Sequence, residues 1–212
     1  MRTGRHSRPR GLHSKGKLVL AGFPRVAVVL ALLAPIPFFL SSFLAGQSAA
    51  QSVSLTQNDV EAAYLYNFGK FVRWPANAQP NRLNICILGQ DPFGATLDHI
   101  LANEVINGHP VAAIRLSNTD SVKSCAILFL SSSEAPHLEE DLSALAQLPI
   151  LTVSDMPEFI QKGGMVQFVL KDHRVRFEVN LNATDKCSLV LSSQLLKVAE
   201  LVVGNPTGKV TG

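Results

Sequence analysis

Three short apolar runs, separated by segments with a helical pattern, constrain the fold of this 212-residue chain more than any other feature. The runs are ICIL, AILFL and ILTV, at 85–88, 126–130 and 150–153. Nearly continuous apolar strands are typical of parallel sheets that helices cover on both faces, because neither face of such a strand meets water. A further strand near 111–116 and helices at about 95–103 and 135–147, the second capped by Ser133, complete the pattern. It predicts a single α/β domain with a mixed, mostly parallel sheet flanked by helices.

Two later strands alternate instead. MVQFVL and RVRFEVN flank KDH, which predicts an antiparallel hairpin in the C-terminal half and at the edge of the sheet. In the second of these strands one face carries Val175, Phe177 and Val179, and the other carries Arg176, Glu178 and Asn180. That polar stripe fits an ordinary solvent-facing strand as well as it fits the wall of a pocket.

The segments around the hairpin are expected to be helical. DMPEFIQKGG predicts a short helix that its glycine pair ends, although the glycines also fit a functional loop. After the hairpin, a helix is expected from about Asn182, with a break near LVLSS. It resumes behind Ser192 as SQLLKVAELVV, with Lys197 and Glu200 as a surface pair.

An aromatic helix opens the domain. Thr56 can cap it, with Asp59 three residues on as a near capping box, and Pro75 ends it. Its predicted buried face recurs at helical spacing and consists of Val60, Tyr64, Phe68, Phe71 and Val72. Tyr66 and Arg73 point away from that face and Trp74 lies at the exit turn, so these three are candidates for contact with a partner or ligand.

The first fifty residues have the layout of a secretory signal peptide: a basic start, an apolar run from Val26 to Leu44, and small residues around Ser48 and Ala50. A permanent membrane anchor is the alternative, but Pro35 and Pro37 interrupt the run. We expect residues 1–50 to be a cleaved signal peptide and 51–57 a lead-in. The domain is expected over 58–203, with a flexible tail at 204–212.

Removal of the leader changes the charge argument. The chain has 19 Lys and Arg against 16 Asp and Glu, a formal net charge of +3. Seven of the basic residues, and none of the acids, lie in the first 25 positions, so the exported part holds 12 bases and 16 acids, a net charge of −4. The sequence therefore gives no indication of nucleic-acid binding.

Three cysteines remain for an oxidising compartment, where disulfides persist. Cys86 and Cys125 lie on strand-like runs, whereas Cys187 lies in a polar, helix-like stretch, so we pair Cys86 with Cys125. Three free, buried thiols are the alternative.

Enzyme signatures are missing from the sequence. It has no G-x-S-x-G elbow, P-loop or H-E-x-x-H motif, and its histidines have no metal-ligand spacing. SSSE at 131–134 and GQDPFG at 89–94 follow strands, where open α/β sheets often bind ligands, but a helix N-cap explains the serines more simply. We expect no catalysis, metal or cofactor.

An ordered set of segments resembles the YfiR-like family over about residues 58–203: AAYLYNFGKFVRWP, LNICILGQDPFG, CAILFLSSSE, LTVSD, GGMVQFVL, VRFEVN and LSSQLLKVAELV. The resemblance implies a periplasmic, often dimeric α/β domain that is not an enzyme. It also implies that Cys86 and Cys125 form a family disulfide linking the first strand to the C-x-I-L-F strand. A second, short-range family disulfide has no counterpart here, since only Cys187 is left.

Such proteins hold an inner-membrane diguanylate cyclase inactive by binding its periplasmic sensor domain, which lowers cyclic di-GMP and biofilm formation. We therefore expect an exported signalling adaptor and repressor whose contact residues are Tyr66, Arg73, Trp74, Arg176, Glu178 and Asn180, with a homodimer as a further assembly. A periplasmic small-molecule sensor feeding a histidine kinase or transporter is the main alternative. A hydrolase that uses Ser131, Ser132 or Ser133 is the third.

Overall fold

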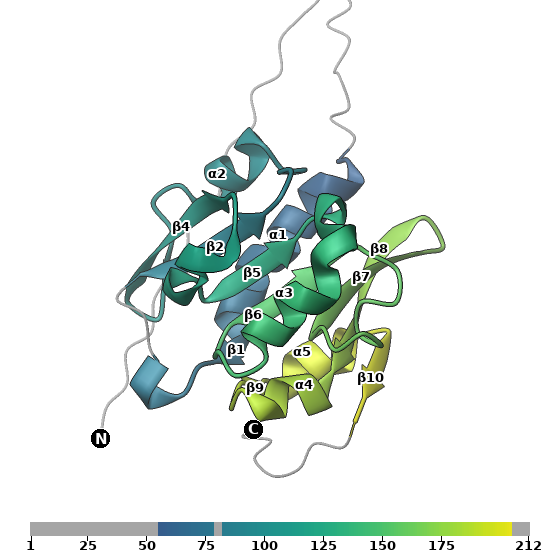
Figure 1. The fold of residues 1–212 in the computed structure, drawn as a ribbon. Helices are drawn as coiled ribbons and strands as arrows, with labels where there is room; N and C mark the ends of the chain where they lie inside the picture. The colour runs from purple at the N-terminus through teal and green to yellow at the C-terminus, as the bar shows by residue number, and fades with distance from the viewer. Residues whose placement is uncertain (1–54, 79–81, 205–212) are drawn as a thin grey trace, which may run out of the picture. The chain divides into compact units, whose positions relative to one another are not determined.

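The computed structural model describes residues 55–78 and 82–204; the expected signal peptide and most of the expected tail lie outside these residues. An eight-stranded sheet has the order β10-β8-β7-β6-β5-β2-β4-β3, and a separate pair joins β1 to β9. Helix α1 covers one face of the large sheet and α3 covers the other (Figure 1). The predicted α/β class is confirmed.

The elements follow one another in an α/β order. The strands are β1 (Val72–Arg73), β2 (Leu83–Leu88), β3 (Val105–Ile106), β4 (His109–Leu116), β5 (Ile127–Leu130), β6 (Leu151–Ser154), β7 (Val166–Lys171), β8 (Arg174–Asn180), β9 (Val190–Leu191) and β10 (Leu201–Val203). The helices are α1 (Gln57–Phe71), α2 (Ala95–Leu101), α3 (Leu138–Leu145), α4 (Leu181–Lys186) and α5 (Ser193–Val198), with 3-10 turns at Ala76–Ala78, Thr119–Ser124 and Ser132–His137.

The three apolar runs form the centre of the sheet, as predicted. Strands β2, β5 and β6 pair in parallel, and β4 pairs in parallel on the other side of β2. Ile87 and Phe129 lie in the core beneath α1, whereas Leu88 and Leu128 lie in the core beneath α3. All four side chains are buried, which explains why these strands show no alternation.

Helix α1 begins as predicted but ends earlier, and its predicted buried face is confirmed in part. Thr56 and Asp59 form the capping box. The chain leaves the helix after Phe71, and Val72 pairs with Leu191 of β9. The fully buried residues of the helix are Glu61, Ala62, Leu65, Phe68 and Gly69. Of the predicted face, Phe68 and Val72 are buried, Tyr64 and Phe71 are partly buried against the same core, and Val60 is half-buried.

The C-terminal hairpin of β7 and β8 is confirmed, with Asp172 and His173 both at positive φ as a two-residue type I′ turn requires. Its predicted position at the edge of the sheet is wrong. Strand β10 pairs in parallel with β8 and forms the edge, Leu201 lying opposite Glu178. The segment LVV is therefore a strand, and the expected helix ends at Val198.

Three smaller predictions are also corrected. Residues 157–163 form turns rather than a helix, because Glu158 has a φ of 61°, outside the helical region. Ser133 does not cap α3, which begins after a 3-10 turn containing Pro136. Glu200 forms an ion pair with Lys171 instead of Lys197.

A disulfide joins Cys86, in the middle of β2, to Cys125, just before β5, across a sequence separation of 39 residues. The predicted pairing is thus present in the structure. Both cysteines belong to the core beneath α3, and Cys187 is a buried free thiol. The cross-link holds two central strands at the amino end of β5.

We expect the double substitution Cys86→Ala with Cys125→Ala to lower the free energy of unfolding by about 4 kcal/mol, because a loop of this length is then no longer closed in the unfolded chain. Urea unfolding measures the change. Cys187→Ala is the control and should cost about 1 kcal/mol. Equal losses in the two variants, or alkylation of Cys86 in the unreduced protein, would contradict the cross-link.

Candidate functional site

The polar stripe of β8 lies on the face of the sheet opposite α1. Phe177 and Val179 are buried beneath α1, while Arg176 and Glu178 are half-buried on the other face. Paired residues in a sheet share a face, so Leu201, opposite Glu178, extends the stripe. The predicted alternation is confirmed.

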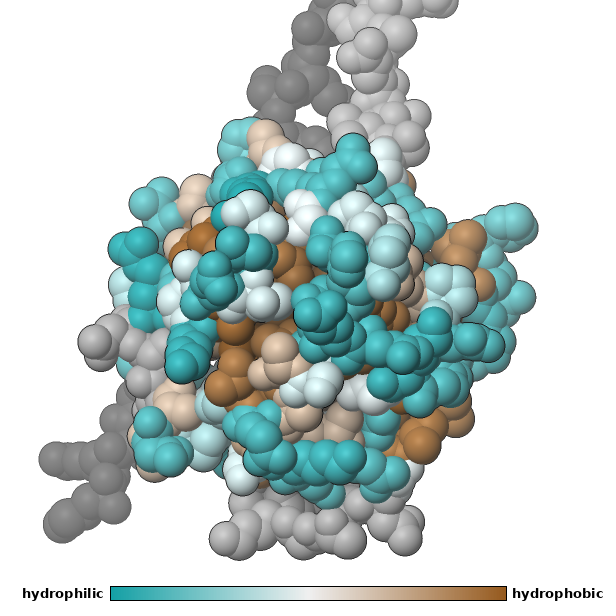
Figure 2. Space-filling model, viewed as in Figure 1, coloured by the Kyte–Doolittle hydropathy of each residue, from teal (hydrophilic) through white to brown (hydrophobic). Residues whose placement is uncertain are grey.

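Strand β10 adds apolar surface to this face. Leu201 is 44% exposed and Val203 is 39% exposed. Figure 2 shows the corresponding brown patch at the lower right, where Figure 1 places β10. We name Arg176, Glu178, Leu201 and Val203 the β8–β10 face. An apolar strip beside one cation and one anion is the kind of surface that protein partners bind.

Asn180 has a structural role instead. Its amide group donates to the carbonyl of Ile160 at 2.9 Å, and its side-chain oxygen accepts from the backbone N–H of Ala183 at 3.2 Å. It therefore caps α4 and ties the 157–163 turns to the sheet. These bonds occupy the groups that a partner would contact, so Asn180 is left out of the β8–β10 face.

The other three predicted contact residues lie away from that face. Tyr66 is half-buried on the α1 side, donates a hydrogen bond to Glu104, and has the ammonium group of Lys70 3.9 Å from its ring centre. Arg73 is exposed on β1 opposite Val190. The structure thus divides the six residues between separate surfaces.

Trp74 lies next to the disulfide. Its indole N–H donates to the carbonyl of Ala126 at 3.2 Å, and its ring lines a cavity of about 300 Å³ that Cys125 and Ile150 also line. Because Ala126 directly follows Cys125, the position of the indole depends on the strand start that the disulfide holds. We therefore expect Trp74 to report the redox state of the disulfide.

The serines after β5 lie at the start of a 3-10 turn, and the side chain of Ser133 makes local hydrogen bonds. Ser133 accepts from the backbone N–H of Gln90 at 2.9 Å and donates to Glu134 at 3.0 Å. A side chain at Gly89, which has a φ of 85°, would collide with Ser133 and Glu134. Among the described residues, no hydrogen bond joins any of the three serines to a histidine, the base that most often activates a serine nucleophile.

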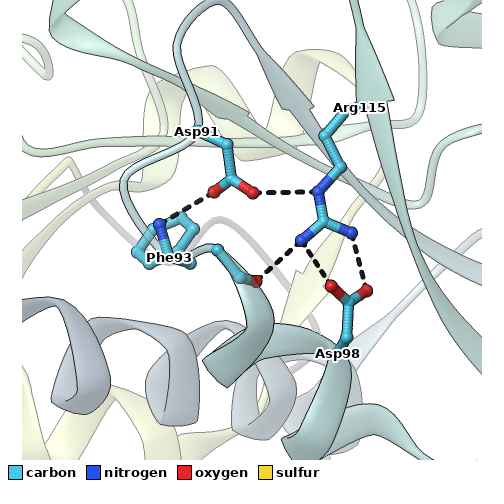
Figure 3. A network of polar contacts seen from close by, with 5 residues as sticks. Asp91, Phe93, Asp98 and Arg115 are labelled. Atoms are coloured by element: carbon cyan, nitrogen blue, oxygen red, sulfur yellow. Dashed lines mark hydrogen bonds and ion pairs between the residues drawn. The ribbon is translucent and has the colours of Figure 1, made fainter.

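Arg115 fixes the neighbouring loop (Figure 3). Its guanidinium forms two hydrogen bonds to Asp98 at 2.6 and 2.8 Å and one to Asp91 at 2.9 Å, and it also donates to the carbonyl of Gly94. The hydrogen bond to Asp98 raises the pKa of Arg115 and lowers that of Asp98. Arg115 of β4 thus ties the loop 89–94, through Asp91 and Gly94, to Asp98 of α2.

A larger cavity of about 600 Å³ lies between α3 and α4, with Leu142, Ala146, Met165, Lys186 and Cys187 among its lining residues. The thiol of Cys187 donates to the carbonyl of Ala146 at 3.3 Å, and burial raises its pKa. Cys187 is therefore a protonated wall residue rather than a reactive thiol.

Neither a membrane-spanning helix nor a metal-binding group of side chains is present among the described residues. Within 55–78 and 82–204, no helix has the length and apolar composition needed to cross a bilayer. The same part of the chain contains no group of three or more side chains that could hold a metal ion.

The fold and this surface define an α/β domain with an exposed, mixed apolar and charged sheet face. The family model described as YfiR/HmsC-like matches residues 58–200. The chain belongs to the YfiR/HmsC-like family.

The sequence pattern did not indicate Leu201 and Val203, because ELVV reads as the end of a helix. It also did not indicate that Glu61 is buried. Glu61 lies four residues before Leu65 and seven before Phe68, a spacing that puts it on the buried face of the helix. This spacing could have indicated its burial.

We expect reduction of the Cys86–Cys125 disulfide to move the emission maximum of Trp74 to longer wavelength, because the start of β5 loosens and water reaches the indole. Fluorescence spectroscopy can follow this, since the chain has one Trp. The Cys86→Ala, Cys125→Ala double variant should have the emission maximum of the reduced protein, and adding the reductant should not change it. Identical spectra for oxidised and reduced wild type would rule out the coupling.

Proposed function

We propose that this chain is an exported, non-catalytic regulator that binds the periplasmic sensor domain of an inner-membrane diguanylate cyclase and keeps the cyclase inactive. Its family membership over residues 58–200 carries the proposal. Loss of the regulator would then raise cyclic di-GMP and favour biofilm formation. The periplasm is the compartment in which such a partner is met and in which the Cys86–Cys125 disulfide persists.

The β8–β10 face is the proposed contact surface. Leu201 supplies exposed apolar area at the edge of the sheet, and Arg176 and Glu178 flank it with opposite charges on the same face. Apolar burial would supply affinity, and the two charges would select the orientation of the partner. Release by an envelope signal requires the two states of this regulator to differ in affinity for the partner.

We expect Leu201→Lys to weaken binding of the sensor domain by roughly 10- to 100-fold, because it puts a charge where apolar area would be buried. Cells carrying the variant should have raised cyclic di-GMP. Binding is measured by titration with the purified sensor domain. Val105→Lys is the matched control: Val105 is also an exposed aliphatic residue on a terminal strand, at the opposite edge of the sheet.

Two outcomes separate the parts of the proposal. Equal affinities of the Leu201→Lys and Val105→Lys variants would remove the β8–β10 face from the interface. Unchanged cyclic di-GMP after deletion of the gene, with the neighbouring cyclase intact, would overturn the repressor function itself.

A small-molecule sensor feeding a histidine kinase or transporter is the second candidate, and the cavity between α3 and α4 favours it. Its volume of about 600 Å³ lies in the range of ligand sites. Native mass spectrometry of the protein purified from the periplasm tests this function: a co-purifying small molecule that Ala146→Trp displaces would support it, and a protein without any would not.

A further inference from the structure

Two carboxyl groups have a buried oxygen each, one on α1 and one just after β6, two elements that border the same core. Glu61 lies in α1 and is only 1% exposed, and the half-buried Asp155 directly follows β6. One oxygen of Glu61 accepts a hydrogen bond from the side-chain amide of Gln57 at 2.9 Å. The other oxygen of Glu61 and one oxygen of Asp155 are buried, and no donor in the described part of the chain reaches them.

No cation neutralises this pair among the described residues. The ion pairs there are those of Arg115 with Asp91 and Asp98, and of Lys171 with Glu200. Helix α1 packs against α2, β2, β8 and α5. The charged or titratable groups on those packed elements are Asp98, His99, Arg174, Arg176, Glu178 and Lys197. The charge that raises the pKa of Glu61 is that of Asp155.

A proton is the partner that these two orphaned oxygens require. An ionised carboxylate without a donor is costly in a nearly dry site, and a second carboxylate beside it adds repulsion. A neutral carboxyl removes the charge and gains an O–H donor that can satisfy an unpartnered acceptor. Gln57 supports either form through its own amide.

We propose that Glu61 and Asp155 form a proton-binding site that seats the first turns of α1 on the sheet when it holds a proton and loosens them when the proton leaves. The site belongs to the domain itself and does not depend on the partner proposed above.

The pKa values agree with this geometry. Burial raises the pKa of Glu61 from 4.5 to about 7, with the Gln57 hydrogen bond opposing the change and the charge of Asp155 adding to it. Burial also raises the pKa of Asp155. Since the folded protein binds the Glu61 proton more tightly than the unfolded chain does, this contribution to stability is complete below the unfolded pKa of 4.5 and is lost as the pH rises through about 7.

Carbon-13 NMR of the side-chain carboxyls tests the site directly. We expect the Glu61 signal to titrate near neutral pH in the folded protein, and substitution Asp155→Asn to move its midpoint to lower pH by removing the like charge. A Glu61 midpoint at the ordinary value of a free glutamate, or one that Asp155→Asn leaves in place, would overturn the proton site.

Hydrogen exchange tests the consequence for α1. From about pH 5.5 to about pH 8, protection factors of amides in the first turns should fall roughly 25-fold. This is the ratio expected over that range when the pKa of Glu61 is about 7 in the folded protein and 4.5 in the unfolded chain. Glu61→Gln keeps the shape of the side chain but has no titratable carboxyl, so the protection of the first turns in this variant should be nearly independent of pH. Glu139→Gln, at an exposed acid of α3, is the control and should behave as wild type. If the protection factors of Glu61→Gln fell with pH as much as those of wild type, the loosening of α1 would be refuted.

Discussion

The packing of Phe68 between the two strands of the hairpin ties the beginning of this domain to its end. Its ring stacks on Phe168 with centroids 5.9 Å apart and meets Phe177 edge-on at 5.2 Å. Tyr64 lies one turn away and contacts the same two rings. Such pairs add to the burial of large apolar area, so α1 is fixed to strands that lie about a hundred residues later. The edge strand β10 in turn needs β8 as its template.

Local patterns were sufficient for the parts of the fold that local physics decides. Central strands buried on both faces must be apolar throughout, and the two alternating strands around Asp172 and His173 specify a hairpin. The cysteine pairing followed because both residues lie on neighbouring strand runs. None of these features depends on a long-range contact that a short stretch of sequence cannot indicate.

Long-range pairing decided the rest. Leu201 and Val203 have a spacing that suits a helix end, and only the free edge of β8 makes them a strand. Val72 leaves α1 because β9 offers it a partner at Leu191. Glu158 adopts positive φ inside a segment with helical composition. The β8–β10 face was therefore half predictable: its charged residues follow from alternation, whereas its apolar residues depend on a pairing that no short window contains.

Helix α1 and the β8–β10 face are two sides of one structural unit. Phe177 of β8 packs on α1, and its neighbours Arg176 and Glu178 point to the opposite face of the sheet. The same helix carries Glu61, two turns before Phe68. A loosened α1 would weaken the support of β8 and β10 directly, through contacts already present, without a separate pathway. Proton binding beside Asp155 and partner binding at β10 would then be linked through one aromatic cluster, and by thermodynamic reciprocity the partner would also tighten the proton.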